Sequence, residues 1–216
     1  MGIVDLFLSG GIVMWPLLGF SILATTLVFE RLLFWLRLYR QQDKFILQIL
    51  SLYSTHPQDA IARLRKQTPF PIARIFLSAL SLEQGTPEDF RLALESAAQG
   101  EMPLLKRFST VFETIIAVAP LLGLLGTILG LMTSFSSLRI GDAVGESAGD
   151  VTAGIGTALI STATGLLVAI ATLLFANLFL GLYRRQRAAI ETYSGRLELL
   201  YRQYYRQYLA RQMKKS

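Results

Sequence analysis

The stretch Ala119–Phe135 reads APLLGLLGTILGLMTSF and contains no Asp, Glu, Lys, Arg or His. It lies inside a longer charge-free interval between Glu113 and Arg139. A helix that crosses a bilayer needs about 20 mostly apolar residues, because each residue adds only about 1.5 Å. The sequence therefore predicts a transmembrane helix at residues 113–138.

Two further intervals have the same character. The first is Ile12–Phe29, which ends at Glu30, and the second lies between Asp150 and Arg184. The second is longer than a bilayer requires, and its beginning, VTAGIGTALIST, is rich in Gly and Thr, which predicts an opening into a cavity or pore. Residues 1–11 contain neither Lys nor Arg. We therefore expect the first interval to remain as an anchor rather than to act as a cleaved signal peptide.

The positive charges are unevenly distributed between these intervals. Of the 21 Lys and Arg residues, eleven lie in residues 30–113 and nine in residues 184–216, whereas residues 139–150 contain only Arg139. Lys and Arg accumulate on the cytoplasmic side of membrane proteins. The count predicts that the N-terminus and the short loop face outward, so that the topology is N-out/C-in.

The rest of the chain is predicted to be helical, because no strand-like alternation of useful length occurs. Thr86-Pro87-Glu88-Asp89 has a cap hydroxyl, a proline and two acids in the order typical of a helix start. The all-α prediction runs as follows: periplasmic N-terminus 1–11, transmembrane helix 12–39, cytoplasmic helical domain 40–112, transmembrane helix 113–138, periplasmic loop 139–150, transmembrane helix 151–183, and cytoplasmic C-terminal helix 184–216.

The C-terminal helix is predicted to be amphipathic. Apolar and aromatic residues recur at spacings of three and four, namely Ile190, Tyr193, Leu197, Leu200, Tyr204 and Tyr208. This face is interpreted as packing on the middle domain. An oligomer contact or a membrane-surface helix is the alternative.

Several classes of function are excluded or disfavoured by composition. The chain has no Cys and a single His, His56, so it lacks the ligands of a typical zinc site, and we expect no metal and no cofactor. Gly154-Ile155-Gly156 starts a dinucleotide-like pattern, but Leu159 stands where a third glycine is needed. We expect no enzyme activity. The net charge of +6 is explained by positive-inside topology, so we expect no nucleic-acid partner.

Small residues recur along the second and third predicted spans. Lipid provides no hydrophobic drive for helix association, so close backbone approach at small residues takes its place. The predicted helix-packing positions are Ala119, Pro120, Gly123, Gly126, Gly130 and Gly165.

Hydroxyl side chains are also frequent at membrane depth. They are Thr127, Thr157, Ser161, Thr162, Thr164 and Thr172. Each can bond to its own preceding turn. At 100° per residue Thr157, Ser161 and Thr164 share a face, whereas Thr162 points about 140° away from Thr157. A straight helix therefore cannot direct all of them into one pore.

The chain resembles a known family in these segments. APLLGLLGTILGLMTSF at Ala119–Phe135, followed by GIGTALISTATGLLVAI at Gly154–Ile170, is similar to the signature of the ExbB/TolQ/MotA proton-channel family. GGIVMWPLLGFSILATTLVFER at Gly10–Arg31 resembles the first span of ExbB more than that of TolQ. A MotA-type protein has four spans, whereas three are predicted here.

The resemblance implies a function. ExbB-like subunits form a homopentamer in the bacterial inner membrane around a pair of single-span ExbD- or TolR-like partners, whose transmembrane Asp carries the ion. The proton motive force then drives a periplasm-spanning, TonB-like protein for outer-membrane uptake. By position, Thr127 and Thr162 match the family's pore threonines. Thr157 stands where the family has a Glu, and Ala171 where a Pro is frequent, so a sodium-using complex stays an alternative. The expected ion-pathway residues are Thr127, Thr157 and Thr162.

Other functions remain open at this point. A TolQ-like subunit for envelope maintenance and a non-conducting membrane scaffold are the alternatives to the ExbB-like motor. A solute transporter would ordinarily show more spans or inverted repeats, and neither is visible in the sequence.

Overall fold

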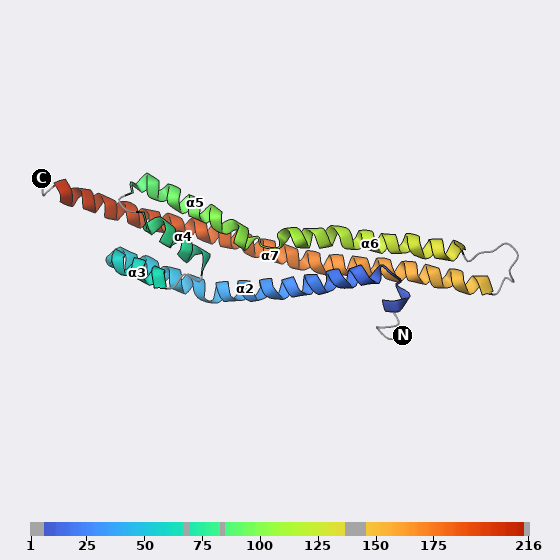
Figure 1. Cartoon of the computed structure of the whole chain (residues 1–216). Helices are drawn as coiled ribbons and strands as arrows, with labels where there is room; N and C mark the ends of the chain where they lie inside the picture. Colours follow the sequence, from blue (N-terminus) through green and yellow to red (C-terminus); the bar gives the residue numbers. More distant parts are fainter. Residues whose placement is uncertain (1–6, 67–69, 83–84, 137–145, 214–216) are drawn as a thin grey trace. The chain divides into compact units, whose positions relative to one another are not determined.

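The computed structural model describes residues 7–66, 70–82, 85–136 and 146–213. In chain order, the labelled helices of Figure 1 are α2 (Met14–Thr55), α3 (Pro57–Lys66), α4 (Pro71–Leu80), α5 (Pro87–Leu105), α6 (Ser109–Ser136) and α7 (Glu146–Met213). No strand occurs in these described ranges, which confirms the all-α prediction. Most of the predicted outer loop 139–150 and of the N-terminal segment 1–11 lies outside the described residues.

Three helical stretches are long and apolar enough to cross a membrane: Met14–Thr55, Pro87–Ser136 and Thr152–Met213. The three-span prediction is confirmed in this sense, and the N-out/C-in orientation stays a prediction. The middle stretch includes both α5 and α6. The chain is thus an all-α membrane protein.

Four of the predicted boundaries fall inside continuous helices: residues 39/40 lie in α2, residues 112/113 in α6, and residues 150/151 and 183/184 in α7. α2 continues past residue 39 to Thr55, and α7 continues past Arg184 to Met213. The residues after Arg184 are mainly Arg, Gln, Ala, Glu and Leu, which are good helix formers, and no proline interrupts them. By contrast, a proline does stand just past the end of α2: Thr55 is the last residue of that helix, and α3 begins at Pro57.

The chain divides into two compact units. The first, here called the membrane unit, consists of Met1–Arg31 and Phe108–Phe179, and the second, the polar unit, of Leu32–Arg107 and Leu180–Ser216. Each unit is described by itself below.

The membrane unit buries most of the small residues of α6, together with a few large ones, and leaves many leucines of α6 and α7 exposed. The buried positions of α6 follow a spacing of three and four, and are Phe112, Ile115, Ala119, Gly123, Gly126, Gly130 and Ser134. By contrast, Leu121 is 62% exposed on α6 and Leu167 is 69% exposed on α7. Exposed apolar side chains recur along both helices, including Leu124, Ile128, Ile170 and Leu174, and a surface of this extent is unusual for a soluble monomer. The arrangement suits lipid, which leaves apolar side chains outside and brings backbones together.

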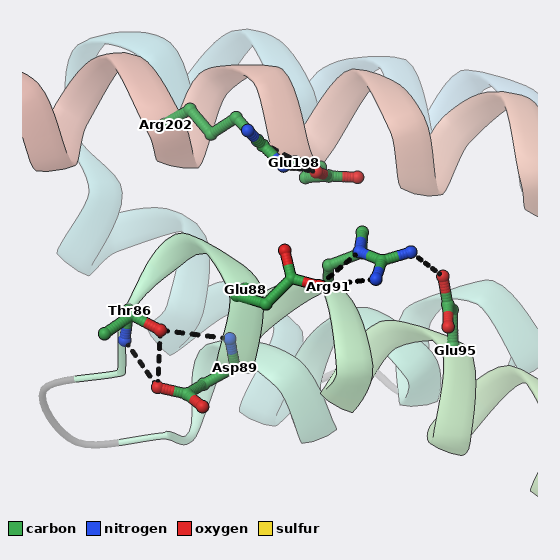
Figure 2. Close-up of polar contacts among 7 residues, drawn as sticks. All are labelled: Thr86, Glu88, Asp89, Arg91, Glu95, Glu198 and Arg202. Carbon is green, nitrogen blue, oxygen red and sulfur yellow. Dashed lines mark hydrogen bonds and ion pairs between the residues drawn. The ribbon is translucent and has the colours of Figure 1, made fainter.

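In the polar unit α3 packs on α4 and α4 packs on α5. α5 begins with a reciprocal cap, in which the Asp89 N–H donates to Thr86 Oγ1 at 3.2 Å and the Thr86 N–H donates to the Asp89 carboxylate at 2.9 Å (Figure 2). The helix start predicted at Thr86 is thereby confirmed. The Thr86 hydroxyl and N–H also hold the pKa of Asp89 below its usual value.

The C-terminal part of α7 packs on α5 through its aromatic face. Tyr201 stacks on Phe90 with ring centroids 4.0 Å apart, and its hydroxyl donates to the carbonyl of Gly85 at 2.6 Å. Ile190 and Leu197 are buried, whereas Tyr204 and Tyr208 are about half exposed. The helix thus packs on the middle domain as interpreted, but the stacking contact is made by Tyr201, which lies outside the predicted face.

Candidate functional site

Over residues 119–165, α6 and α7 of the membrane unit meet at small residues, whereas nearer the other end of the contact the rings of Phe112 and Phe179 lie 5.8 Å apart. We call the contact between the small residues the small-residue seam: Ala119, Gly123, Gly126 and Gly130 of α6 with Gly154, Ala158, Ser161, Thr162 and Gly165 of α7. A methyl group placed on Gly165 would lie 2.5 Å from the Ala119 carbonyl oxygen. One placed on Gly130 would lie 2.7 Å from the Gly154 carbonyl oxygen. Because the obstacles are backbone atoms, no side chain larger than hydrogen fits at either position.

Gly123 and Gly126 face the same stretch of α7. A methyl group on Gly123 would lie 3.0 Å from the Ser161 carbonyl oxygen and 3.0 Å from the Thr162 Cα. On Gly126 it would overlap the Ser161 hydroxyl. Gly123 and Gly126 are among the predicted helix-packing positions, and the structure places both against α7 of the same chain. Their size is therefore already required within one protomer.

Two hydroxyls of α7 reach across the seam to one carbonyl group of α6. Thr162 Oγ1 donates to the Gly123 oxygen at 3.1 Å, and Ser161 Oγ lies 3.4 Å from the same oxygen. Ser161 also donates to its own turn, at 3.0 Å from the Ala158 oxygen. Glycine has no side chain to screen its carbonyl, so the Gly123 backbone can receive these hydroxyls at close range. Ser161 is fully buried, and the sequence did not place it among the expected site residues.

The other two expected pathway residues bond to their own turns. Thr127 Oγ1 donates to the Leu124 oxygen at 2.7 Å, and Thr157 Oγ1 donates to the Ala153 oxygen at 3.1 Å. A methyl group on Gly11 would lie 3.2 Å from the Thr157 Cγ2 atom, so Thr157 lies beside the turn that precedes α2. Gly11 adopts φ 72°, a conformation that favours glycine.

All three expected threonines are partly accessible rather than buried. In the part of the chain that the structure describes, no hydrogen bond joins any two of them. Each already donates its proton to a carbonyl group, so the remaining capacity of each hydroxyl is to accept. As they stand, these hydroxyls suit a protonated carboxyl group or a cation better than a carboxylate.

Pro120 lies inside α6, which continues through it to Ser136. Proline lacks an N–H, so it cannot donate to the carbonyl four residues earlier. Its neighbour Ala119 is fully buried at the seam and supplies the carbonyl oxygen nearest to Gly165. The expected packing positions thus all lie on or next to the seam.

No acid, His, Lys or Arg occurs between residues 114 and 138 or between residues 151 and 183. Among the described residues no group of His, Cys, Asp or Glu could hold a metal ion. The membrane unit therefore offers hydroxyl and carbonyl oxygens at membrane depth, without a side chain of its own that titrates near neutral pH.

Similarity to known proteins agrees with this arrangement. Residues 67–192 match the MotA/TolQ/ExbB proton channel family. A Synechocystis protein named ExbB-like 3 is 56% identical over 200 residues, which cover 93% of this chain and 95% of the relative. ExbB-like 1 of the same organism is 42% identical over 204 residues, covering 93% of this chain and 80% of the relative.

A shorter similarity extends to a transport protein of another organism. The biopolymer transport protein ExbB of Xanthomonas campestris is 41% identical over 88 residues, which cover 40% of this chain and 34% of the relative. The family is one of transport and channel proteins. From the extent of the family match and of the two longer similarities, the chain belongs to the MotA/TolQ/ExbB proton channel family, and the predicted resemblance to ExbB is confirmed.

Proposed function

We propose that this chain is an ExbB-like subunit of an ion-driven motor in a bacterial inner membrane. The motor converts the proton motive force, or a sodium gradient in its place, into mechanical work on a periplasm-spanning, TonB-like protein. The chain itself catalyses no reaction and needs no cofactor. The observation that carries this proposal is the small-residue seam, which packs two helices closely and yet contains no titratable side chain.

A proton path at membrane depth normally uses Asp, Glu or His, because a hydroxyl group has no accessible charged form that could hold a proton in transit. This chain has none of them in its second and third apolar intervals. The carrier must therefore come from a partner, for which a single-span, ExbD- or TolR-like protein with an intramembrane Asp is the proposed source. Five copies of the chain surround two copies of that partner in the proposed complex.

The seam supports a role for this chain as the polar wall of the path. A carboxylate at the centre of a span costs about 2.5–3.5 kcal/mol on insertion scales. Thr127, Thr157 and Thr162 offer acceptor oxygens to a protonated carboxyl group or to a cation beside it. Thr157 stands where the resemblance implies a Glu, so this chain lacks a carboxylate that could relay protons there, and a sodium gradient stays an alternative to the proton motive force.

The mass and stoichiometry of the purified complex test this proposal. The chain is co-expressed with a single-span, ExbD- or TolR-like protein and analysed by native mass spectrometry in detergent. We expect five copies of this chain with two copies of a partner that carries an intramembrane Asp. A stable assembly that never contains such a partner would instead support the non-conducting scaffold.

The topology of the chain is a separate prediction from the charge count. A fluorescent reporter fused after Ser216 should be active in the cytoplasm, and alkaline phosphatase inserted near Gly145 should be active outside it. Both positions lie outside the described residues. If alkaline phosphatase inserted near Gly145 were inactive while a fluorescent reporter at the same position was active in the cytoplasm, the three-span topology would be wrong.

A further inference from the structure

A polar groove lies between α2 and α7 within the polar unit. It has a volume of about 320 Å³ and is lined by residues of both helices, among them Tyr39, Gln42, Asp43, Arg185 and Gln186. This volume is at the lower end of the range of small-molecule sites. None of these residues belongs to the small-residue seam.

The floor of the groove is a reciprocal pair of amides. Gln42 Nε2 donates to Gln186 Oε1 at 3.1 Å, and Gln186 Nε2 donates to Gln42 Oε1 at 2.8 Å. Both side chains are about 97–98% buried. Each amide nitrogen carries two protons, and this pairing uses one of them. The floor therefore holds the two helices in register and retains polar capacity of its own.

The groove begins where the apolar part of α7 ends. Leu180–Tyr183 is the last apolar turn, and Arg184 and Arg185 follow directly. The Arg185 guanidinium lies 5.9 Å from the centroid of the Tyr39 ring. No ion pair of Arg185 occurs among the residues described, so its charge is available. Tyr beside Arg at the end of an apolar helix is typical of the headgroup level of a bilayer.

An acidic group lies one turn further along α2. Asp43 accepts a hydrogen bond from the Tyr193 hydroxyl at 3.1 Å. Asp43 follows Tyr39 by four residues, which is about 6 Å along the helix axis. The Tyr193 ring is itself faced by the Arg196 guanidinium at 5.9 Å. The groove thus presents a cation near the membrane and an anion just beyond it.

We propose that this groove binds the phosphoethanolamine headgroup of a membrane phospholipid. The phosphate lies against Arg185, which can donate charge-assisted hydrogen bonds to it. Two carbons further on, the ammonium group donates to Asp43. A phosphocholine headgroup is disfavoured because it has no N–H to donate, and because Arg185 and Arg196 already occupy the faces of the two tyrosine rings that would attract it. A phosphoglycerol headgroup brings negative charge to Asp43 without a cation to offset it.

Lipid retention by the purified full-length chain tests the proposal. The chain is incubated in detergent with phosphatidylethanolamine, phosphatidylglycerol or phosphatidylcholine of identical acyl chains, and bound lipid is counted by native mass spectrometry. We expect phosphatidylethanolamine to be retained about tenfold more strongly than either of the others, which corresponds to about 1.4 kcal/mol. Equal retention of all three lipids would overturn the assignment.

Matched variants identify the groups responsible. Arg185→Gln should reduce retention of phosphatidylethanolamine to the level of phosphatidylcholine. Asp43→Asn, which still accepts from Tyr193, should remove the preference over phosphatidylglycerol. Arg184→Gln removes the same charge at the neighbouring position, outside the groove, and should change nothing. An equal loss in the Arg184 variant would show a general charge effect and overturn the site.

A last comparison separates a lipid from a soluble phosphate ester. Free phosphoethanolamine, added without lipid, should not raise the midpoint of thermal unfolding at concentrations at which the lipid does so, because it lacks the acyl chains that hold the headgroup at this level. Equal stabilisation by the soluble compound would show that the groove serves a metabolite and not a membrane.

Discussion

Gly165→Ala is expected to destabilise the chain by about 1–3 kcal/mol, the usual cost of overpacking a close contact. The added methyl group would lie 2.5 Å from the Ala119 oxygen and 3.1 Å from the Gly123 Cα, so α6 and α7 would have to move apart. The free energy of unfolding is measured in detergent by titration with SDS, followed by the fluorescence of Trp15 and Trp35.

Gly156→Ala on the same helix provides the control for this variant. A methyl group on Gly156 has no neighbour within 4 Å. Alanine is the better helix former by about 1 kcal/mol, so this control should be neutral or slightly stabilising. The same Gly→Ala change is thus expected to lower the free energy of unfolding at position 165 and to leave it unchanged or raise it slightly at position 156. If both variants were neutral, the seam would not be the tight contact described above.

Thr162→Val is expected to reduce ion flux through the assembled complex by up to about tenfold and to leave the assembly intact. Valine keeps the shape and removes the oxygen that would accept from a protonated carboxyl group, and a neutral hydrogen bond contributes about 0.5–1.5 kcal/mol, of which the upper end corresponds to about tenfold. The lost bond to the Gly123 oxygen costs little by itself, because interhelical hydrogen bonds in membranes average about 0.6 kcal/mol. Ser161 also remains within 3.4 Å of that oxygen.

Two controls accompany the Thr162 variant. Thr162→Ser retains the hydroxyl and should retain most of the flux. Thr164→Val removes a hydroxyl that bonds only to the Ile160 oxygen of its own turn, at 2.8 Å, and should have little effect. Flux through proteoliposomes and the mass of the complex are measured together. Full flux in Thr162→Val would remove this hydroxyl from the proposed pathway.

Much of the fold could be predicted from the sequence because charges are excluded from lipid. The interval between Glu113 and Arg139 was sufficient to place α6, and the cap at Thr86 was sufficient to place the start of α5. The third predicted span ends at residue 183, but the helix α7 continues past this point without a break. Loss of hydrophobicity after Tyr183 ends the apolar segment, but the charged residues that follow still favour helix, so the sequence suggested a boundary where the backbone continues.

The partners of individual side chains were harder to predict. The helical angles predicted that Ser161 shares a face with Thr157 and that Thr162 points away from that face. In the structure, however, the hydroxyls of Thr162 and Ser161 both reach the Gly123 oxygen. The angle fixes the direction of a side chain on its own helix but not the position of the neighbouring helix. Likewise, nothing in the sequence pairs Gln42 with Gln186, which are 144 residues apart.

The central claim is that this chain forms the polar wall of an ion path whose carrier lies in a partner. It is tested most directly by gradient-driven ion flux into liposomes that contain a pH- or sodium-sensitive dye. Three preparations are compared: the chain alone, the chain with its single-span partner, and the chain with a partner whose intramembrane Asp is changed to Asn. We expect flux only in the second preparation. Flux through the chain alone, or flux that survives the Asn change, would contradict the account.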